Sequence, residues 1–107
     1  ASMHTNTFLG RPVEVDDEGF LTRPEQWDAD LAAELGRIAG VDEMTAEHWR
    51  VVHFARSDFD TTGEAPTLRR MQKAGGFDIK RIFALFPGKP AKKIAYIAGR
   101  PKPRACV

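Results

Sequence analysis

The chain ends in the stretch GRPKPRACV (residues 99–107), which separates a helical pattern upstream from the only cysteine of the sequence. Gly99 is the residue type that most often follows a helix C-terminus, and Pro101 cannot continue a helix because it lacks a backbone N–H. Pro101 and Pro103 also favour extended backbone in the residues before them. The sequence therefore predicts one folded domain over residues 1–98 and an extended, flexible C-terminal arm over residues 99–107.

Such an arm can carry the Cys106 thiol into the pocket of another protein. Cys106 lies seven positions after Gly99, a reach of roughly 20–25 Å at ~3.3 Å per extended residue. The thiolate is the reactive form of cysteine. Arg100, Lys102 and Arg104 favour the thiolate and can dock a partner, whereas the terminal carboxylate of the chain opposes them. The alternative is that Cys106 is a surface cysteine without a function.

The composition is that of one globular domain. The 107 residues are 42% hydrophobic and 29% charged, with a formal net charge of +1, which provides no global field for nucleic acid or a membrane. One cysteine excludes an internal disulfide framework and a multi-cysteine zinc site, so we expect no metal and a reducing, cytoplasmic location. No apolar run reaches the length of a membrane span. We interpret residues 1–3 as a cloning remnant and expect no signal peptide.

Alternating apolar residues predict a small β-hairpin near the N-terminus, within residues 5–21. Phe8, Val13 and Val15 are separated by polar residues, and residues 16–19 (DDEG) have the composition of a turn. Two strands alone are marginally stable, so this hairpin needs a helix beneath it.

Five short helices are predicted after the hairpin, giving a mainly α, orthogonal bundle. They run from Thr22 to Gly40, from Thr45 to about Phe59, from Ala65 to Gly75, from Phe77 to Phe86 and from Pro90 to Ala98. Thr22-Arg23-Pro24-Glu25 resembles a capping box. The large apolar residues predicted to face inward include Trp27, Leu31, Leu35, Val52, Met71, Ile82, Phe83, Phe86 and Ile94. His48 and His53 are five positions apart, which is not the spacing of a helical metal site.

Basic residues gather in the C-terminal half, while most acidic residues precede residue 65. The basic residues of the last three helices are Arg69, Arg70, Lys73, Lys80, Arg81, Lys89, Lys92 and Lys93. Solvated helix faces account for most of these charges. The functional alternative is a docking surface around the arm, for an acidic partner or for RNA that the partner holds.

Several short motifs together resemble the DsrC/TusE family of sulfur-relay proteins. The C-terminal motifs are LFP (residues 85–87), GKPAK (88–92), AG (98–99), PKP (101–103) and the final CV (106–107). The upstream motifs EGFL (18–21), EHW (47–49) and AP (65–66) follow in the same order as in that family. The resemblance covers nearly the whole chain, and its C-terminal block is highly specific.

The resemblance implies a small helical domain with a short hairpin, a mobile arm and a sulfur-carrying role for Cys106. Members of the DsrC branch have a second cysteine at the position of Ala95 and serve dissimilatory sulfite reductase through a trisulfide or an intramolecular disulfide. This chain has alanine there and is more similar to single-cysteine TusE. The resemblance then implies that Cys106 takes a persulfide from an upstream relay complex and passes it towards a tRNA thiouridylase, with no other cofactor.

We therefore expect a carrier and not a self-contained enzyme, because the partner supplies the rest of the reaction site. One alternative is a DsrC-like partner subunit of sulfite reductase or a carrier in sulfur oxidation. Another is a nucleic-acid-binding regulator, since a hairpin with helices can resemble a winged helix. No recognition helix with clear base-reading residues stands out, which argues against direct nucleic-acid binding.

Overall fold

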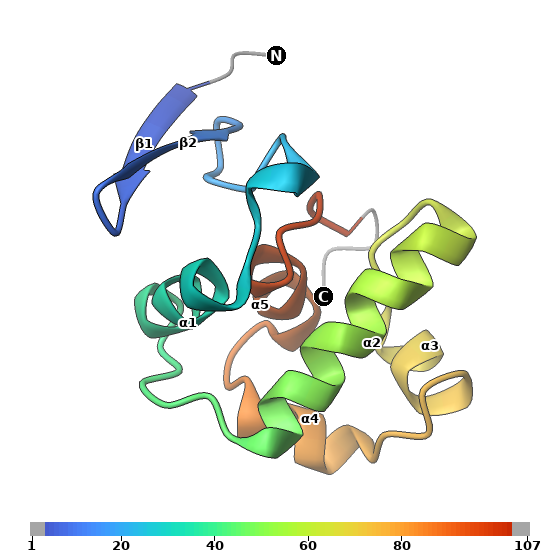
Figure 1. Cartoon of the computed structure of the whole chain (residues 1–107). Coiled ribbons are helices and arrows are strands. Elements are labelled where there is room, and N and C mark those ends of the chain that lie inside the picture. The colour runs from blue at the N-terminus through green and yellow to red at the C-terminus, as the bar shows by residue number, and fades with distance from the viewer. Residues whose placement is uncertain (1–3, 104–107) are drawn as a thin grey trace.

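A computed structural model describes residues 4–103 of the chain and shows a bundle of helices with a hairpin at one end (Figure 1). The strands are β1 (His4–Phe8) and β2 (Arg11–Val15), followed by a short 3₁₀ turn η1 (Pro24–Gln26). The helices are α1 (Ala29–Ile38), α2 (Ala46–Thr62), α3 (Leu68–Lys73), α4 (Ile79–Leu85) and α5 (Pro90–Ile97). The predicted fold, a mainly helical domain with an N-terminal hairpin, is confirmed.

The hairpin turns at an unexpected place. β1 and β2 pair antiparallel with Phe8 opposite Arg11, so Leu9 and Gly10 form a two-residue turn. Both turn residues have positive φ, 52° and 74°, as hairpin turns of this length require. The predicted turn, residues 16–19, instead forms a second turn in which the Asp16 carboxylate accepts from the backbone N–H groups of Glu18 and Phe20. Sequence reasoning missed the first turn because leucine rarely adopts positive φ.

The first helix starts later than predicted, at an aspartate cap. The Asp28 carboxylate accepts from the Leu31 N–H at 2.8 Å, so α1 begins at Ala29. The Thr22 capping box is therefore wrong: residues 24–26 form only the 3₁₀ turn, and Trp27 has extended backbone. Trp27 is pulled out of the helical pattern because its indole N–H donates to the Ile97 carbonyl at 2.8 Å.

The other four helices lie where they were predicted, with shifted ends. The Thr45 cap is confirmed, and α2 continues past Phe59 to Thr62, where Gly63 ends it with a φ of 78°. The third helix is capped by Thr67 and starts after the predicted Ala65. In α4, Ile82 is buried but Phe83 is 44% exposed, so the inward placement of Phe83 was wrong. The six-to-seven-residue length of α3 and α4 leaves each only one buried residue.

Helix α5 lies at the centre of the bundle, with α1 and α2 packed against it (Figure 1). Ile94 and Ile97 are fully buried in one core with Val51 and Val52 of α2. The hairpin is held by a second core, in which Phe8, Val13 and Val15 pack on Leu31 and Leu35 of α1. Among the described residues, no helix has the length and apolar character needed to cross a bilayer. The central position of α5 matters because the C-terminal arm continues directly from it.

We predict that His48→Ala lowers the free energy of unfolding by about 1–3 kcal/mol, because it removes buried hydrogen bonds. His48 is 8% exposed. Its Nδ1 accepts from the Thr45 N–H at 3.1 Å, and its Nε2 donates to the Leu85 carbonyl at 2.9 Å. The imidazole therefore caps α2 and ties it to α4. Urea unfolding measures the change, with the exposed Lys80 of α4 as control: Lys80→Ala should cost less than about 0.5 kcal/mol.

Candidate functional site: the anchored base of the C-terminal arm

The predicted sulfur carrier, Cys106, and the predicted supporting residue Arg104 lie outside the described residues. The structure does describe the first part of the arm, residues 99–103, which we call the arm base. It contains the other two predicted site residues, Arg100 and Lys102. The arm base is the point from which residues 104–107 continue.

Arg100 is buried and holds the arm base to α2. Its side chain is only 9% exposed, and its guanidinium donates to the Asp60 carboxylate at 3.0 Å. The guanidinium carbon lies 4.6 Å from the centre of the Phe59 ring. The Arg100 backbone N–H donates to the Ala95 carbonyl at 3.0 Å. Arg100 is thus placed to anchor the arm, whereas the sequence had suggested a docking role at the surface.

Two side chains from distant segments donate hydrogen bonds to the last carbonyls of α5, immediately before the arm. The last carbonyls of a helix have no partner within the helix and need one elsewhere. Trp27 donates to the Ile97 carbonyl, and the Arg56 guanidinium donates to the Ala98 carbonyl at 2.6 Å. Arg56 also lies 3.8 Å above the Trp27 ring. Burial lowers the pKa of Arg56, and the nearby charge of Arg100 lowers it further.

Gly99 packs directly against the Trp27 side chain. Its φ is 69°, the left-handed conformation that glycine adopts without strain. A Cβ atom at this position would lie 2.4 Å from Cδ1 of Trp27. No larger residue fits here unless the indole moves. Sequence reasoning identified Gly99 as a helix stop but missed Trp27 and Arg56, because an indole or a guanidinium cap from a distant segment leaves no local pattern.

The rest of the arm base also lies on the domain. The Lys102 ammonium lies 3.1 Å from the Glu18 carboxylate, and Pro103 is buried. The sequence placed the domain boundary after residue 98, whereas the structure shows contacts with the domain through residue 103. Cys106 is three positions beyond Pro103, the last described residue, and three extended residues span roughly 10 Å. This is less than half the reach calculated from Gly99.

We predict that Arg100→Ala lowers the free energy of unfolding by about 1–3 kcal/mol, because a mostly buried, charge-assisted contact is lost. Asp60 is 72% exposed, so its freed carboxylate is hydrated and adds no burial penalty. Hydrogen exchange of the residue-100 backbone amide, which donates to the Ala95 carbonyl in the wild type, should also be faster in the variant. The control is Arg37→Ala, which removes a surface ion pair with Glu34. Equal amide exchange in both variants would argue against an anchoring role for Arg100.

Ala95 lies inside the protein, on the face of α5 below the arm. It is 1% exposed and packs with Phe20 and Ala65. The described residues contain no group of three or more His, Cys, Asp or Glu side chains that could hold a metal ion. The single cysteine of the sequence leaves only chemistry that one thiol can perform within this chain.

Comparisons with known proteins agree with this arrangement. Residues 7–107 match the family model described as DsrC-like protein. The gamma subunit of dissimilatory-type sulfite reductase from Nitratidesulfovibrio vulgaris is 33% identical over 101 residues, with 94% of this chain and 96% of that protein covered. The sulfurtransferase TusE of Salmonella paratyphi A is 35% identical, with 94% and 97% covered.

Solved structures show the same fold. The NMR structure of DsrC from Allochromatium vinosum superposes with a TM-score of 0.79 at 31% sequence identity, and the match covers 99% of this chain and all of that one. The likeness therefore includes the hairpin, all five helices and the arm base. The expectation drawn from the short motifs is confirmed, and this chain belongs to the DsrC-like family.

Proposed function

We propose that this protein is a sulfur carrier that accepts a persulfide on Cys106 and hands it to a partner enzyme. The observation that carries the proposal is the single thiol of the chain, placed just beyond an arm base that Arg100, Trp27 and Arg56 fix to the domain. Similarity to a sulfurtransferase, TusE, supports the same role. The carrier needs no other cofactor, and a reducing cytoplasm keeps its thiol available.

The loading step needs only the thiolate and a donor persulfide. The Cys106 thiolate attacks the outer sulfur of a donor R–S–SH and forms a new S–S bond. The S–S bond of the donor breaks, and its electron pair leaves with the donor sulfur as R–S⁻. The product is Cys106–S–SH, and no external oxidant is consumed. An acceptor thiolate or nucleophile then takes the outer sulfur by the same exchange, which regenerates the Cys106 thiolate.

The anchored arm base determines what the partner must do. Because Cys106 lies only three positions after Pro103, the partner's reactive group must approach within roughly 10 Å of Pro103. The partner therefore contacts the domain as well as the arm. Lys102 lies at this contact, since its ammonium is bonded to Glu18 on the domain surface. Arg104 also belongs to this supporting role in the proposal, by favouring the anionic thiolate and persulfide.

The acceptor we favour is a tRNA thiouridylase, as for TusE. The DsrC-like alternative uses a second cysteine at the position of Ala95, and here that position is an alanine buried against Phe20 and Ala65. The alternative partner is sulfite reductase, which the gamma-subunit relative supports. Persulfide-loaded protein should be mixed with a bacterial tRNA thiouridylase and tRNA, and 2-thiouridine quantified by mass spectrometry. Thiouridine formation supports the proposal; stable co-elution with sulfite reductase and no thiouridine would favour the alternative.

A further inference from the structure

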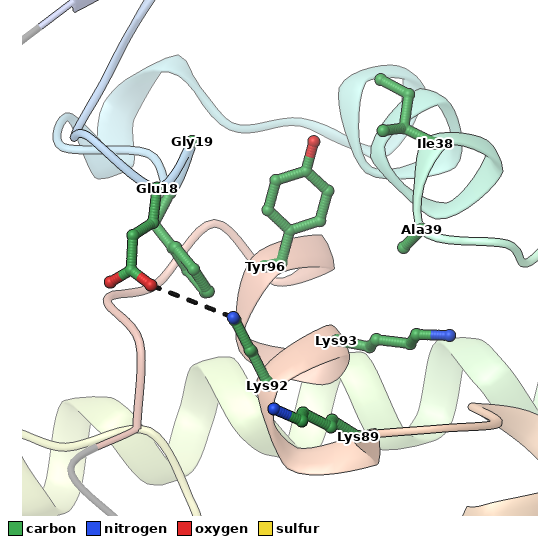
Figure 2. A pocket seen from close by; sticks show the side chains of 9 residues that line it. Glu18, Gly19, Ile38, Ala39, Lys89, Lys92, Lys93 and Tyr96 are labelled. Atoms are coloured by element: carbon green, nitrogen blue, oxygen red, sulfur yellow. Dashed lines mark ion pairs between the residues drawn. The ribbon is translucent and has the colours of Figure 1, made fainter. Parts of the chain in front are cut away.

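A pocket of about 450 Å³ lies beside the arm base, between the end of α1 and the exposed side of α5. We call it the lysine pocket. Its apolar wall is made by Phe20, Ile38 and Tyr96, and its basic wall by Lys89, Lys92 and Lys93. Figure 2 shows Tyr96 between Ile38 on one side and the lysines of α5 on the other. The pocket thus combines an apolar surface with three ammonium groups.

The apolar wall of the pocket combines a buried aromatic residue with an exposed aliphatic one. Phe20 is 2% exposed and meets Tyr96 edge to face at a ring distance of 5.7 Å. Ile38 is 50% exposed, although it is a large aliphatic residue at the pocket mouth. An open apolar wall of this kind favours an aromatic or aliphatic side chain from outside.

Positive charge is in excess around this wall. Glu18 is the one carboxylate among the lining residues, and its oxygen lies 3.9 Å from the Lys92 ammonium (Figure 2). The same oxygen lies 3.1 Å from the Lys102 ammonium. The Lys93 ammonium donates to the Pro87 carbonyl. The Lys89 backbone carbonyl accepts from the Lys93 N–H, but its side-chain ammonium has no hydrogen bond or ion pair with any residue from 4 to 103. At least this ammonium group is available to an anionic partner.

The position of the pocket beside the arm base indicates which kind of partner binds there. The bond between Lys102 and Glu18 places the arm base at the pocket rim. A protein that holds Cys106 in its reaction site lies within roughly 10 Å of Pro103 and must extend over this rim. We propose that the lysine pocket binds an acidic segment of the relay partner, with an aromatic or large aliphatic side chain between its carboxylates. This inference rests on the carrier function proposed above.

A nucleic acid fits the pocket less well than such a segment. Phosphate binding uses basic residues that follow the backbone of the strand, whereas these lysines form one wall of a pocket whose other wall is apolar. Carboxylates that flank an apolar side chain match both halves of the pocket, since charge complementarity selects the partner and apolar burial adds affinity.

The test is an NMR titration of the full-length, reduced, ¹⁵N-labelled protein with the acetylated and amidated peptide DEFDE at low salt. We expect amide shifts centred on Lys89, Ile38 and Tyr96, which weaken as salt increases. The neutral peptide NQFNQ and the peptide DEGDE, which lacks the aromatic ring, should each bind at least about fivefold more weakly. Equal binding of NQFNQ, or shifts located elsewhere, would overturn the proposal.

Matched variants locate the contact. Lys89→Glu and Ile38→Ser should each weaken DEFDE binding by about tenfold. Lys73→Glu makes the same charge change on α3, and Leu9→Ser removes another exposed aliphatic residue, 54% exposed, from the hairpin. Neither control should change the affinity. A short single-stranded RNA that produces the same shifts at lower concentration than DEFDE would instead assign the pocket to nucleic acid.

A second readout separates this proposal from the carrier function. Loading of Cys106 by inorganic polysulfide needs no docking, so Lys89→Glu should load at the wild-type rate. Transfer from the loaded variant to a protein acceptor should be at least about fivefold slower. Normal polysulfide loading with unchanged transfer would overturn the docking proposal alone. A wild-type protein that fails to load would overturn the carrier function itself.

Discussion

Gly99→Ala is expected to lower the free energy of unfolding by about 2–4 kcal/mol, through backbone strain and overpacking together. The left-handed conformation at Gly99, with a φ of 69°, costs an alanine about 1–2 kcal/mol. The added methyl would also lie 2.4 Å from the Trp27 ring. The indole must then move, which breaks its hydrogen bond to the Ile97 carbonyl. Chemical unfolding followed by tryptophan fluorescence measures the loss.

Gly63→Ala is the matched control for this prediction. Gly63 also has positive φ, 78°, but a Cβ atom there would meet nothing within 4 Å. Its alanine variant should therefore show only the backbone part of the cost, about 1–2 kcal/mol. If both variants lose the same stability, contact with Trp27 is not what holds the arm base, and the anchoring described above would be incorrect.

Cys106→Ser is expected to abolish sulfur transfer completely, while the stability of the domain stays within about 0.5 kcal/mol of wild type. A serine hydroxyl is not ionised near neutral pH and cannot form a persulfide, so neither half of the exchange can occur. The measurement is 2-thiouridine formation in a reaction reconstituted with a persulfide donor, a tRNA thiouridylase and tRNA.

The control for Cys106→Ser is Ala95→Ser, a small change on the buried face of α5 that leaves the thiol in place. Ala95→Ser should keep its transfer activity, apart from losses explained by reduced stability. A Cys106→Ser protein that still supports thiouridine formation would show that sulfur passes between donor and acceptor without this chain.

Local sequence signals predicted much of the fold. Thr45 and Pro90 mark the starts of α2 and α5 because capping and N-terminal proline act within one turn. The buried set Ile82, Phe86 and Ile94 follows from helical periodicity. These features depend on neighbours in sequence, so the sequence alone was sufficient for them.

The errors arose where distant segments meet. Trp27 was placed on a helix face, but its bond to the Ile97 carbonyl, seventy positions away, gives it extended backbone. The bond between Arg100 and Asp60 was not predicted, because the two residues are forty positions apart. Phe83 was placed inward because helical spacing cannot tell which side of a short helix is covered. The anchored arm base and the lysine pocket are built from such long-range contacts, so no local pattern predicted them.

Intact-mass spectrometry of the wild-type protein after incubation with inorganic polysulfide tests the carrier function most directly. We expect the mass to increase by whole sulfur atoms, the increase to map to the C-terminal peptide that contains Cys106, and reductant to remove it. A protein that gains no sulfur from polysulfide or from a protein persulfide donor, while Cys106 reacts freely with an alkylating agent, would contradict the carrier function.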